Sequence, residues 1–259
     1  MNVLESFFIL LGGLWAGTIN TVVGSGTLVT FPILIALGIA PVMAVVSNAM
    51  GLIAGGVSGT WGYRRELRGM GRNLARLMPA SLLGGMTGAY LLLHLPESVF
   101  SYVAPALIVL ALALVIFQPR LQGVIKKRRE SATSSRSHET IMVLLVFLTG
   151  VYGGYFVAAQ GVLLVAILGI FMSGTLQNAN AVKNVLALSV NIVAAISYLL
   201  FAPEKIIWQV VALIAVSSLA GGFLGARIGR KLPPVVLRTV IVILGLVALF
   251  FMIQKLVVA

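Results

Sequence analysis

Residues 6–37 read SFFILLGGLWAGTINTVVGSGTLVTFPILIAL, an apolar run whose middle is interrupted by Asn20, Thr21 and the stretch 24–27. A straight helix of these 32 residues would be about 48 Å long, whereas the hydrocarbon core of a bilayer is only about 30 Å thick. Glycines and hydroxyl side chains favour an unwound or re-entrant stretch, which is tolerated at membrane depth only where protein or a cavity covers it. The run therefore predicts a membrane segment that is broken near its centre.

Seven further apolar segments follow along the chain, at about 42–63, 77–95, 98–117, 141–172, 180–201, 206–226 and 235–257. Hydrophobic residues make up 60% of the 259 residues, charged residues only 9%, and the mean hydropathy is +1.10. No soluble domain of this length keeps such a balance, and a membrane β-barrel would show short alternating strands instead. We therefore predict an all-α integral membrane protein with about eight hydrophobic segments, surrounded by membrane lipids.

The two halves of the sequence repeat. Ser81–Ala89 (SLLGGMTGA) aligns without gaps on Ser218–Ala226 (SLAGGFLGA), an offset of 137 residues (218 minus 81). We expect the shared glycines to form close helix contacts. The long segment 141–172 is then the counterpart of 6–37, and it too carries a polar, glycine-rich middle. We predict a first repeat at 1–118, a basic cytoplasmic linker at 119–140 and a second repeat at 141–259.

The cations set the expected orientation. Eighteen Lys and Arg stand against six Glu, for a formal net charge of +12. Eleven of the cations lie in two loops, at Arg64, Arg65, Arg68, Arg72 and Arg76, and at Arg120, Lys126, Lys127, Arg128, Arg129 and Arg136. Such clusters are typical of cytoplasmic loops. Nucleic-acid binding is excluded, because the aromatic residues lie in the apolar segments and do not interleave with the basic clusters.

A third basic loop decides between two topologies. If every segment crosses the membrane once, the repeats are parallel and the loop with Arg227, Arg230 and Lys231 lies outside. If each long first segment enters and returns, each half has an odd number of crossings and the repeats are inverted. All three basic loops then lie in the cytoplasm, so the inverted arrangement is favoured.

Lys183 and its neighbours are the first candidate for a binding site. Lys183 and Asn184 lie within the sixth segment, and Asn191 lies near the same helical face. The equivalent second segment carries Asn48. A cation and amides beside a cavity form a plausible anion site, because an unpaired ammonium facing lipid costs several kcal/mol. The alternative is that Lys183 snorkels to the headgroups.

The break in each long segment is the second candidate. Ser25 and Thr27 lie just before an apolar helical run, where free backbone N–H groups at a helix N-terminus can meet an anion, with Asn20 nearby. In the second half the polar middle contains Gln160. The alternative is a hinge in which Ser and Thr bond back to the backbone.

Missing residue types exclude other chemistries. The chain has no Cys and no Asp, and its six Glu fall in loops or at segment ends, so thiolate chemistry and a carboxylate relay for protons or sodium are not expected. His94 and His138 have no metal-ligand or triad partner at useful spacing. We therefore predict no cofactor, no metal and no enzymatic activity.

A familiar motif runs through the first two segments. It consists of Gly17–Thr27, followed by Phe31–Leu34 and then by Pro41 and Val46–Asn48. In these residues, in length, in its duplicated halves and in its central basic loop the chain resembles the sulfite exporter TauE/SafE permease family. That resemblance implies a multi-pass carrier of the bacterial plasma (inner) membrane, handling sulfite, sulfoacetate or a related sulfur-containing anion. The matching stretch of the second half, Gly154–Leu164, lacks the Ser-Gly-Thr run.

The functional prediction is a permease that exports a small anion, driven by the membrane potential. The expected substrate-binding residues are Asn20, Ser25, Thr27, Asn48, Gln160, Lys183 and Asn184. An anion leaving a cell that is negative inside gains about 2.3 kcal/mol per charge at 100 mV. The alternatives are an anion channel and a membrane assembly protein without transport activity, and a homo-oligomer is compatible with the sequence.

Overall fold

The chain is a bundle of long helices. The computed structural model describes residues 1–129, 136–227 and 234–258, and within them the chain forms ten α-helices and no strand. The helices are α1 (Val3–Val22), α2 (Thr27–Ala36), α3 (Pro41–Gly62), α4 (Gly71–His94), α5 (Glu97–Arg129), α6 (Arg136–Tyr155), α7 (Gln160–Phe171), α8 (Leu176–Phe201), α9 (Trp208–Arg227) and α10 (Pro234–Val258), with a short 3-10 turn, η1 (Pro203–Lys205), before α9.

The structure has ten helices where the sequence suggested about eight segments. The segments at 6–37 and 141–172 each hold two helices, α1 with α2 and α6 with α7, so the expected break is present in both. Two helices extend into the stretch 119–140 that was expected to be a linker. Helix α5 continues to Arg129 and α6 begins at Arg136, so regular structure covers both ends of that basic stretch.

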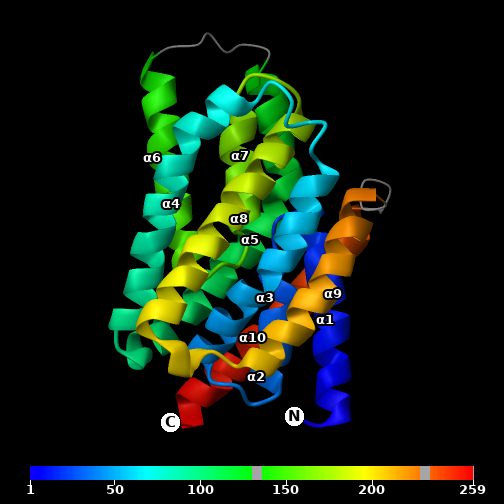
Figure 1. Cartoon of the computed structure of the whole chain (residues 1–259), viewed down its shortest axis with the longest axis vertical. Helices are drawn as coiled ribbons and strands as arrows, with labels where there is room; N and C mark the ends of the chain where they lie inside the picture. The colour runs from blue at the N-terminus through cyan, green and yellow to red at the C-terminus, as the bar shows by residue number, and fades with distance from the viewer. Residues whose placement is uncertain (130–135, 228–233, 259) are drawn as a thin grey trace.

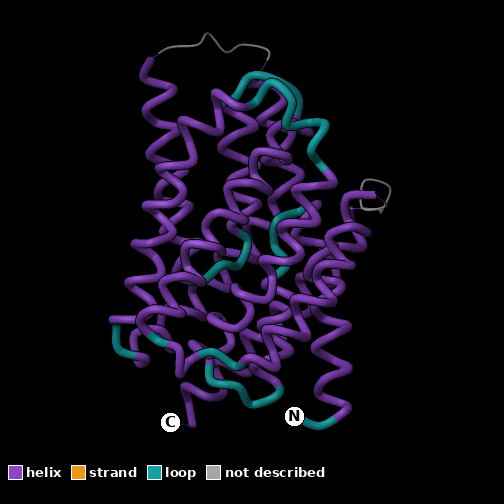
Figure 2. The backbone as a smooth tube through the Cα atoms, in the orientation of Figure 1, coloured by secondary structure: helices purple, strands orange, loops and turns teal. Residues whose placement is uncertain are grey.

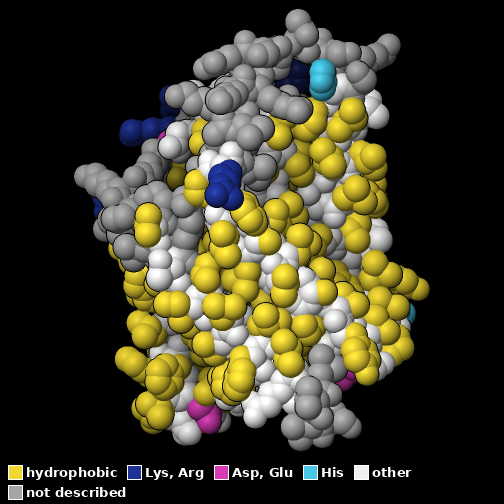
Figure 3. All heavy atoms as spheres, turned by 180° about the vertical axis from the view of Figure 1, so that it is seen from behind, with side chains coloured by type: hydrophobic (Ala, Val, Ile, Leu, Met, Phe, Trp, Pro, Cys, Tyr) yellow, Lys and Arg dark blue, Asp and Glu magenta, His cyan; other side chains and the backbone are white. Residues whose placement is uncertain are grey.

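The surface of the bundle is that of a membrane protein. Helices α1, α3, α8, α9 and the Glu97–Arg120 part of α5 are long and apolar enough to cross a bilayer. Figure 3 shows hydrophobic side chains over most of the height of one face, with Lys and Arg side chains near one end. We call this end, where α3 connects to α4, the basic end.

The two broken helix pairs enter the bundle from opposite ends (Figure 1). Helix α1 starts at the end opposite the basic end, and α2 returns toward that opposite end. Helix α6 starts at the basic end, and α7 returns toward that end. The loops between the paired helices lie near mid-height (Figure 2), where the N–H of Gly161 donates to the carbonyl of Gly24 at 3.0 Å. The middle of the bundle is therefore built from four helix ends.

The halves interleave instead of packing as separate domains. Helix α1 of the first half packs on α9, and its counterpart α6 of the second half packs on α4. In the same way, α3 packs on α9 and its counterpart α8 packs on α4. Helix α2 packs on α10, and its counterpart α7 packs on α5. Each of these contacts thus has an equivalent in which the roles of the halves are exchanged. Neither repeat can bury its own polar and small-residue faces without the other.

Glycines form the tightest of these contacts, as the sequence predicted. A Cβ at Gly88 of α4 would meet the Val151 carbonyl and the Tyr155 amide of α6. On the other side of the bundle, a Cβ at Gly221 of α9 would meet the backbone of α1 at Leu14 and Thr18. Small residues let helix backbones approach closely in membranes, where packing, rather than hydrophobicity, drives association.

We expect Gly88→Ala to destabilise the protein by about 1–3 kcal/mol, because the new methyl group overlaps backbone atoms that cannot rotate away. The matched control is Gly71→Ala on the same helix, where an added Cβ meets nothing within 4 Å. That change should be neutral or stabilising by up to about 1 kcal/mol. Thermal unfolding in detergent, followed by size-exclusion chromatography, measures both, and equal stabilities would contradict the packing argument.

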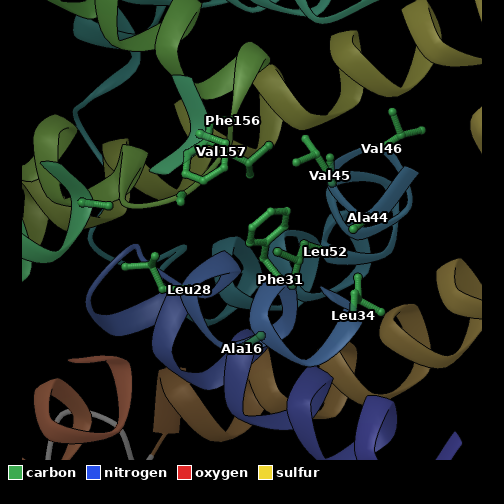
Figure 4. Close-up of a cluster of buried hydrophobic side chains, with 14 of the residues drawn as sticks. Ala16, Leu28, Phe31, Leu34, Ala44, Val45, Val46, Leu52, Phe156 and Val157 are labelled. Atoms are coloured by element: carbon green, nitrogen blue, oxygen red, sulfur yellow. The ribbon is translucent and has the colours of Figure 1, made fainter. Parts of the chain in front are cut away.

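An apolar cluster lies beside the helix breaks. Phe31 of α2 and Phe156, which follows α6, meet edge to face with ring centroids 5.5 Å apart. Figure 4 shows both rings with Val45 and Leu52 of α3 around them. These side chains are buried, so one wall of the central region is dry and rigid.

Candidate functional site

Glycine makes the first break. Helix α1 ends where the N–H groups of Val23 and Gly24 both donate to the carbonyl of Ile19. Helix α2 starts where the N–H of Leu28 donates to the carbonyl of Ser25. Gly24 has a φ of +89°, a conformation that side chains with a Cβ rarely adopt. A Cβ there would also overlap the backbone of Gly161. Both properties explain why glycine occupies the centre of this break.

The second break is made differently. It consists of residues 156–159, in which the N–H of Ala158 donates to the carbonyl of Phe156 at 2.8 Å, a γ-turn around Val157. Val157 has a φ of +67° and Ala159 a φ of +58°. Residues other than glycine cost about 1–3 kcal/mol each in such conformations, and that strain clusters at functional sites. The polar and glycine residues of this segment on which the predicted break was based, Gly153, Gly154, Gln160 and Gly161, lie in the flanking helices instead.

The side chain of Lys183, on α8, reaches the last turn of α1. Its Nζ donates to the carbonyl of Asn20 at 2.9 Å and to that of Thr21 at 3.2 Å. Lys183 is 1% exposed, and its Cδ lies 2.9 Å from where a Cβ on Gly161 would be. Carbonyls in the last turn of a helix lack intrahelical partners and form the negative end of the helix dipole, so they stabilise an ammonium. This geometry rules out the snorkelling interpretation.

Two amides of α8 accompany the lysine. The Nδ2 atoms of Asn180 and Asn184 lie 3.3 and 3.4 Å from the carbonyl of Thr21, one helical turn apart along α8. Thr21 thus accepts from three side chains of one helix face. We predicted Asn184 from its place beside Lys183, but Asn180 was missed, although the spacing of 180, 183/184 and 191 on one face was visible.

Each break carries a buried polar group without a hydrogen-bond partner. Ser25, which precedes α2, is 1% exposed, and Gln160, the first residue of α7, is 2% exposed. Among the described residues, neither Ser25 Oγ nor Gln160 Nε2 finds a hydrogen-bond partner. Each belongs to a helix N-terminus, whose first N–H groups have no acceptor within their own helix. Buried donors without partners are rare in proteins and mark the place of a water or ligand.

The remaining predicted residues are used within the protein. Asn48 of α3 donates from Nδ2 to Thr27 Oγ1 at 3.0 Å, and its Oδ1 accepts from Thr30. These bonds hold the start of α2 against α3, so Asn48 and Thr27 position the break. Asn20 contributes its carbonyl to Lys183, while its side chain stays partly exposed. The seven predicted residues therefore divide into four with side-chain donors near the breaks, a supporting pair behind α2, and one backbone acceptor; the four are Ser25, Gln160, Lys183 and Asn184, the pair is Thr27 and Asn48, and the acceptor is Asn20.

Further buried polar groups were not among the seven expected binding residues. The hydroxyls of Tyr152 and Tyr155 and the Oδ1 atoms of Asn180 and Asn191 are buried without partners among the described residues. Across all the residues that the structure describes, no group of three or more His, Cys, Asp or Glu could hold a metal ion. Lys183 is the only charged side chain among the buried residues that the structure describes. The region offers hydrogen-bond donors and one positive charge, and both favour the binding of an anion.

Comparison with known proteins finds membrane transporters. The family described as Sulfite exporter TauE/SafE matches residues 9–252. A Haemophilus influenzae protein named “Probable membrane transporter protein” is 25% identical, over 90% of this chain and 88% of its own length. Escherichia coli K12 “Probable membrane transporter protein YfcA” is 26% identical, over 90% and 85%, and Sinorhizobium “Probable membrane transporter protein ORF9” is 28% identical, over 86% and 81%. No solved structure matches the chain significantly.

Proposed function

The chain belongs to the sulfite exporter TauE/SafE family of membrane transporters, and on that basis we propose that it carries a small oxyanion, such as sulfite, through the site between its two helix breaks. It is a multi-pass protein of the bacterial plasma membrane. The observation that carries the proposal is a buried Lys183, bonded to the end of α1 and packed beside Gly161 at the start of α7, together with buried donors without partners at Ser25 and Gln160.

The chemistry of this region supports an anion as cargo. A sulfur oxyanion accepts several hydrogen bonds, and the N-termini of α2 and α7 offer backbone N–H groups with the positive end of a helix dipole. Secondary transporters commonly bind anionic groups at the N-termini of half-helices near the middle of the membrane. Within this proposal, Ser25 and Gln160 donate hydrogen bonds, Lys183 supplies charge, and Asn180 and Asn184 keep Lys183 in place.

A flux experiment on purified protein in liposomes tests the proposal. The flux of radiolabelled sulfite should saturate as its concentration rises. Competition by unlabelled anions then ranks the candidate substrates: sulfite, sulfate, thiosulfate, sulfoacetate, and acetate as a carboxylate control. A potassium diffusion potential tests whether voltage drives export. Absence of uptake for every sulfur anion would contradict transport of this class, and flux that rises without saturation would indicate a channel.

We also propose that the repeats are inverted, with the basic end in the cytoplasm. Support comes from the opposite entry of α1 and α6 (Figure 1) and from the exposed Arg64, Arg65 and Arg68 between α3 and α4. Alternating access in such folds moves one repeat against the other around a fixed site.

Because the natural chain has no cysteine, single cysteines can test this topology directly. His94→Cys at the end of α4 and Arg227→Cys at the end of α9 should react with a membrane-impermeant maleimide from opposite sides, His94→Cys from outside the cell and Arg227→Cys only after the membrane is opened. Parallel repeats would place both on the same side, so equal labelling of the two in intact cells would disprove the inverted arrangement.

A further inference from the structure

The buried charge of the site is a single cation without a carboxylate partner. Among the described residues, the acidic side chains Glu5, Glu66, Glu97, Glu139 and Glu204 all retain exposure at helix ends or in loops. Arg76 pairs with Glu139 and Lys205 pairs with Glu97, and neither pair includes Lys183. The acceptors that the described residues offer to Lys183 Nζ are the backbone carbonyls of Asn20 and Thr21.

Those carbonyls offset only part of the charge. The end of a helix carries roughly half an elementary charge, and an ammonium has three N–H donors, two of which are directed at Asn20 and Thr21. An ion buried in a low-dielectric interior needs a well-placed partner of opposite charge to balance its lost hydration. A bound anion with one negative charge completes this balance, whereas an anion with two charges leaves one uncompensated.

We infer that Lys183 makes this a site for a single negative charge, so that the protein selects monovalent over divalent oxyanions and moves the loaded site as a neutral unit. The inference rests on the proposed function and narrows its substrate class. In this cycle the loaded site crosses the membrane field without net charge, and the empty site returns with the charge of Lys183. One-for-one exchange of a monovalent anion is therefore insensitive to membrane potential, while net export depends on it.

Methanesulfonate and sulfate are the matched probes, because both are tetrahedral and differ mainly in a methyl group replacing a charged oxygen. In liposomes containing the purified protein, each is added as a competitor of radiolabelled sulfite exchange. We expect methanesulfonate to compete at least about tenfold more strongly than sulfate, the ratio that corresponds to one modest uncompensated interaction. Equal or stronger competition by sulfate would overturn the inference, as would competition by neither.

The second measurement compares exchange and net efflux of labelled methanesulfonate with and without a potassium diffusion potential of about 100 mV. Exchange should keep its rate and net efflux should change. Exchange that responds as strongly as net efflux would overturn the inference, as would a failure of methanesulfonate to exchange. In Lys183→Gln, any residual exchange should become voltage-dependent, and if that variant does not fold, the wild-type measurements still decide. Absence of sulfite flux in the wild type would instead refute the proposed function.

Discussion

Lys183→Gln is expected to reduce sulfite flux by roughly 10- to 150-fold, the equivalent of the 1.5–3 kcal/mol that a hydrogen bond to a charged group contributes. Glutamine keeps an N–H donor that can reach the carbonyls of Asn20 or Thr21 but carries no charge. Folding should therefore survive. Flux in liposomes and thermal unfolding in detergent, measured on the same preparation, separate the two effects.

Two further variants make this result interpretable. Lys183→Met also removes the donor and leaves the Asn20 carbonyl unsatisfied, at a cost of about 1–3 kcal/mol, while Thr21 keeps Asn180 and Asn184 as donors. It should therefore lower both flux and stability. Lys205→Met is the matched control, because Lys205 forms a partly exposed pair with Glu97 at 3.0 Å, and such pairs contribute only about 0–1 kcal/mol. Wild-type flux in Lys183→Gln would show that the lysine is only a cap for α1.

The central features of the fold could be predicted because they have strong physical causes. An apolar run too long for one crossing, with glycines at its middle, has to break, and both 6–37 and 141–172 do. The duplicated Gly-Gly-x-x-Gly faces have to pack against a backbone, and Gly88 and Gly221 do. A lysine within an apolar helix has to find acceptors or reach water, and Lys183 finds acceptors.

The details of the site were harder to predict, because they depend on which segments meet in space. Nothing near Lys183 in the sequence indicates that its acceptors are carbonyls of α1, a contact across 163 residues. Likewise, Asn48 resembles a ligand in sequence but bonds to Thr27 and Thr30, because α2 returns beside α3. Residue type indicates that a polar group is buried at a cost, but only the fold shows which partner compensates it.

The second break illustrates a different limit. Valine and alanine prefer regular helix or strand, so a γ-turn at Val157 with positive φ at Val157 and Ala159 has no local signal. The surrounding structure forces it: α6 ends where Phe156 packs on Phe31, and α7 begins where Gly161 bonds to Gly24. Strain of this kind is retained where two alternative conformations are useful, as a moving carrier requires.

Gly24→Ala is expected to be the most damaging single-methyl change in the protein, lowering stability by about 2–5 kcal/mol and removing flux. Two costs add there. A residue with a Cβ at a φ of +89° is disfavoured by about 1–2 kcal/mol, and its methyl group would overlap the Gly161 backbone, which costs about 1–3 kcal/mol more. Thermal unfolding in detergent and sulfite flux in liposomes measure the two consequences.

Gly38→Ala separates the two costs, because Gly38 has a similar φ of +82° but an added Cβ there meets nothing within 4 Å. It should show only the conformational cost, about 1–2 kcal/mol, and retain flux. The difference between the variants then measures the contact between the two breaks near mid-height of the bundle. If both variants lost stability equally and both still transported sulfite, Gly24 and Gly161 would be turn residues of no functional consequence, and the anion site would have to lie elsewhere along α8.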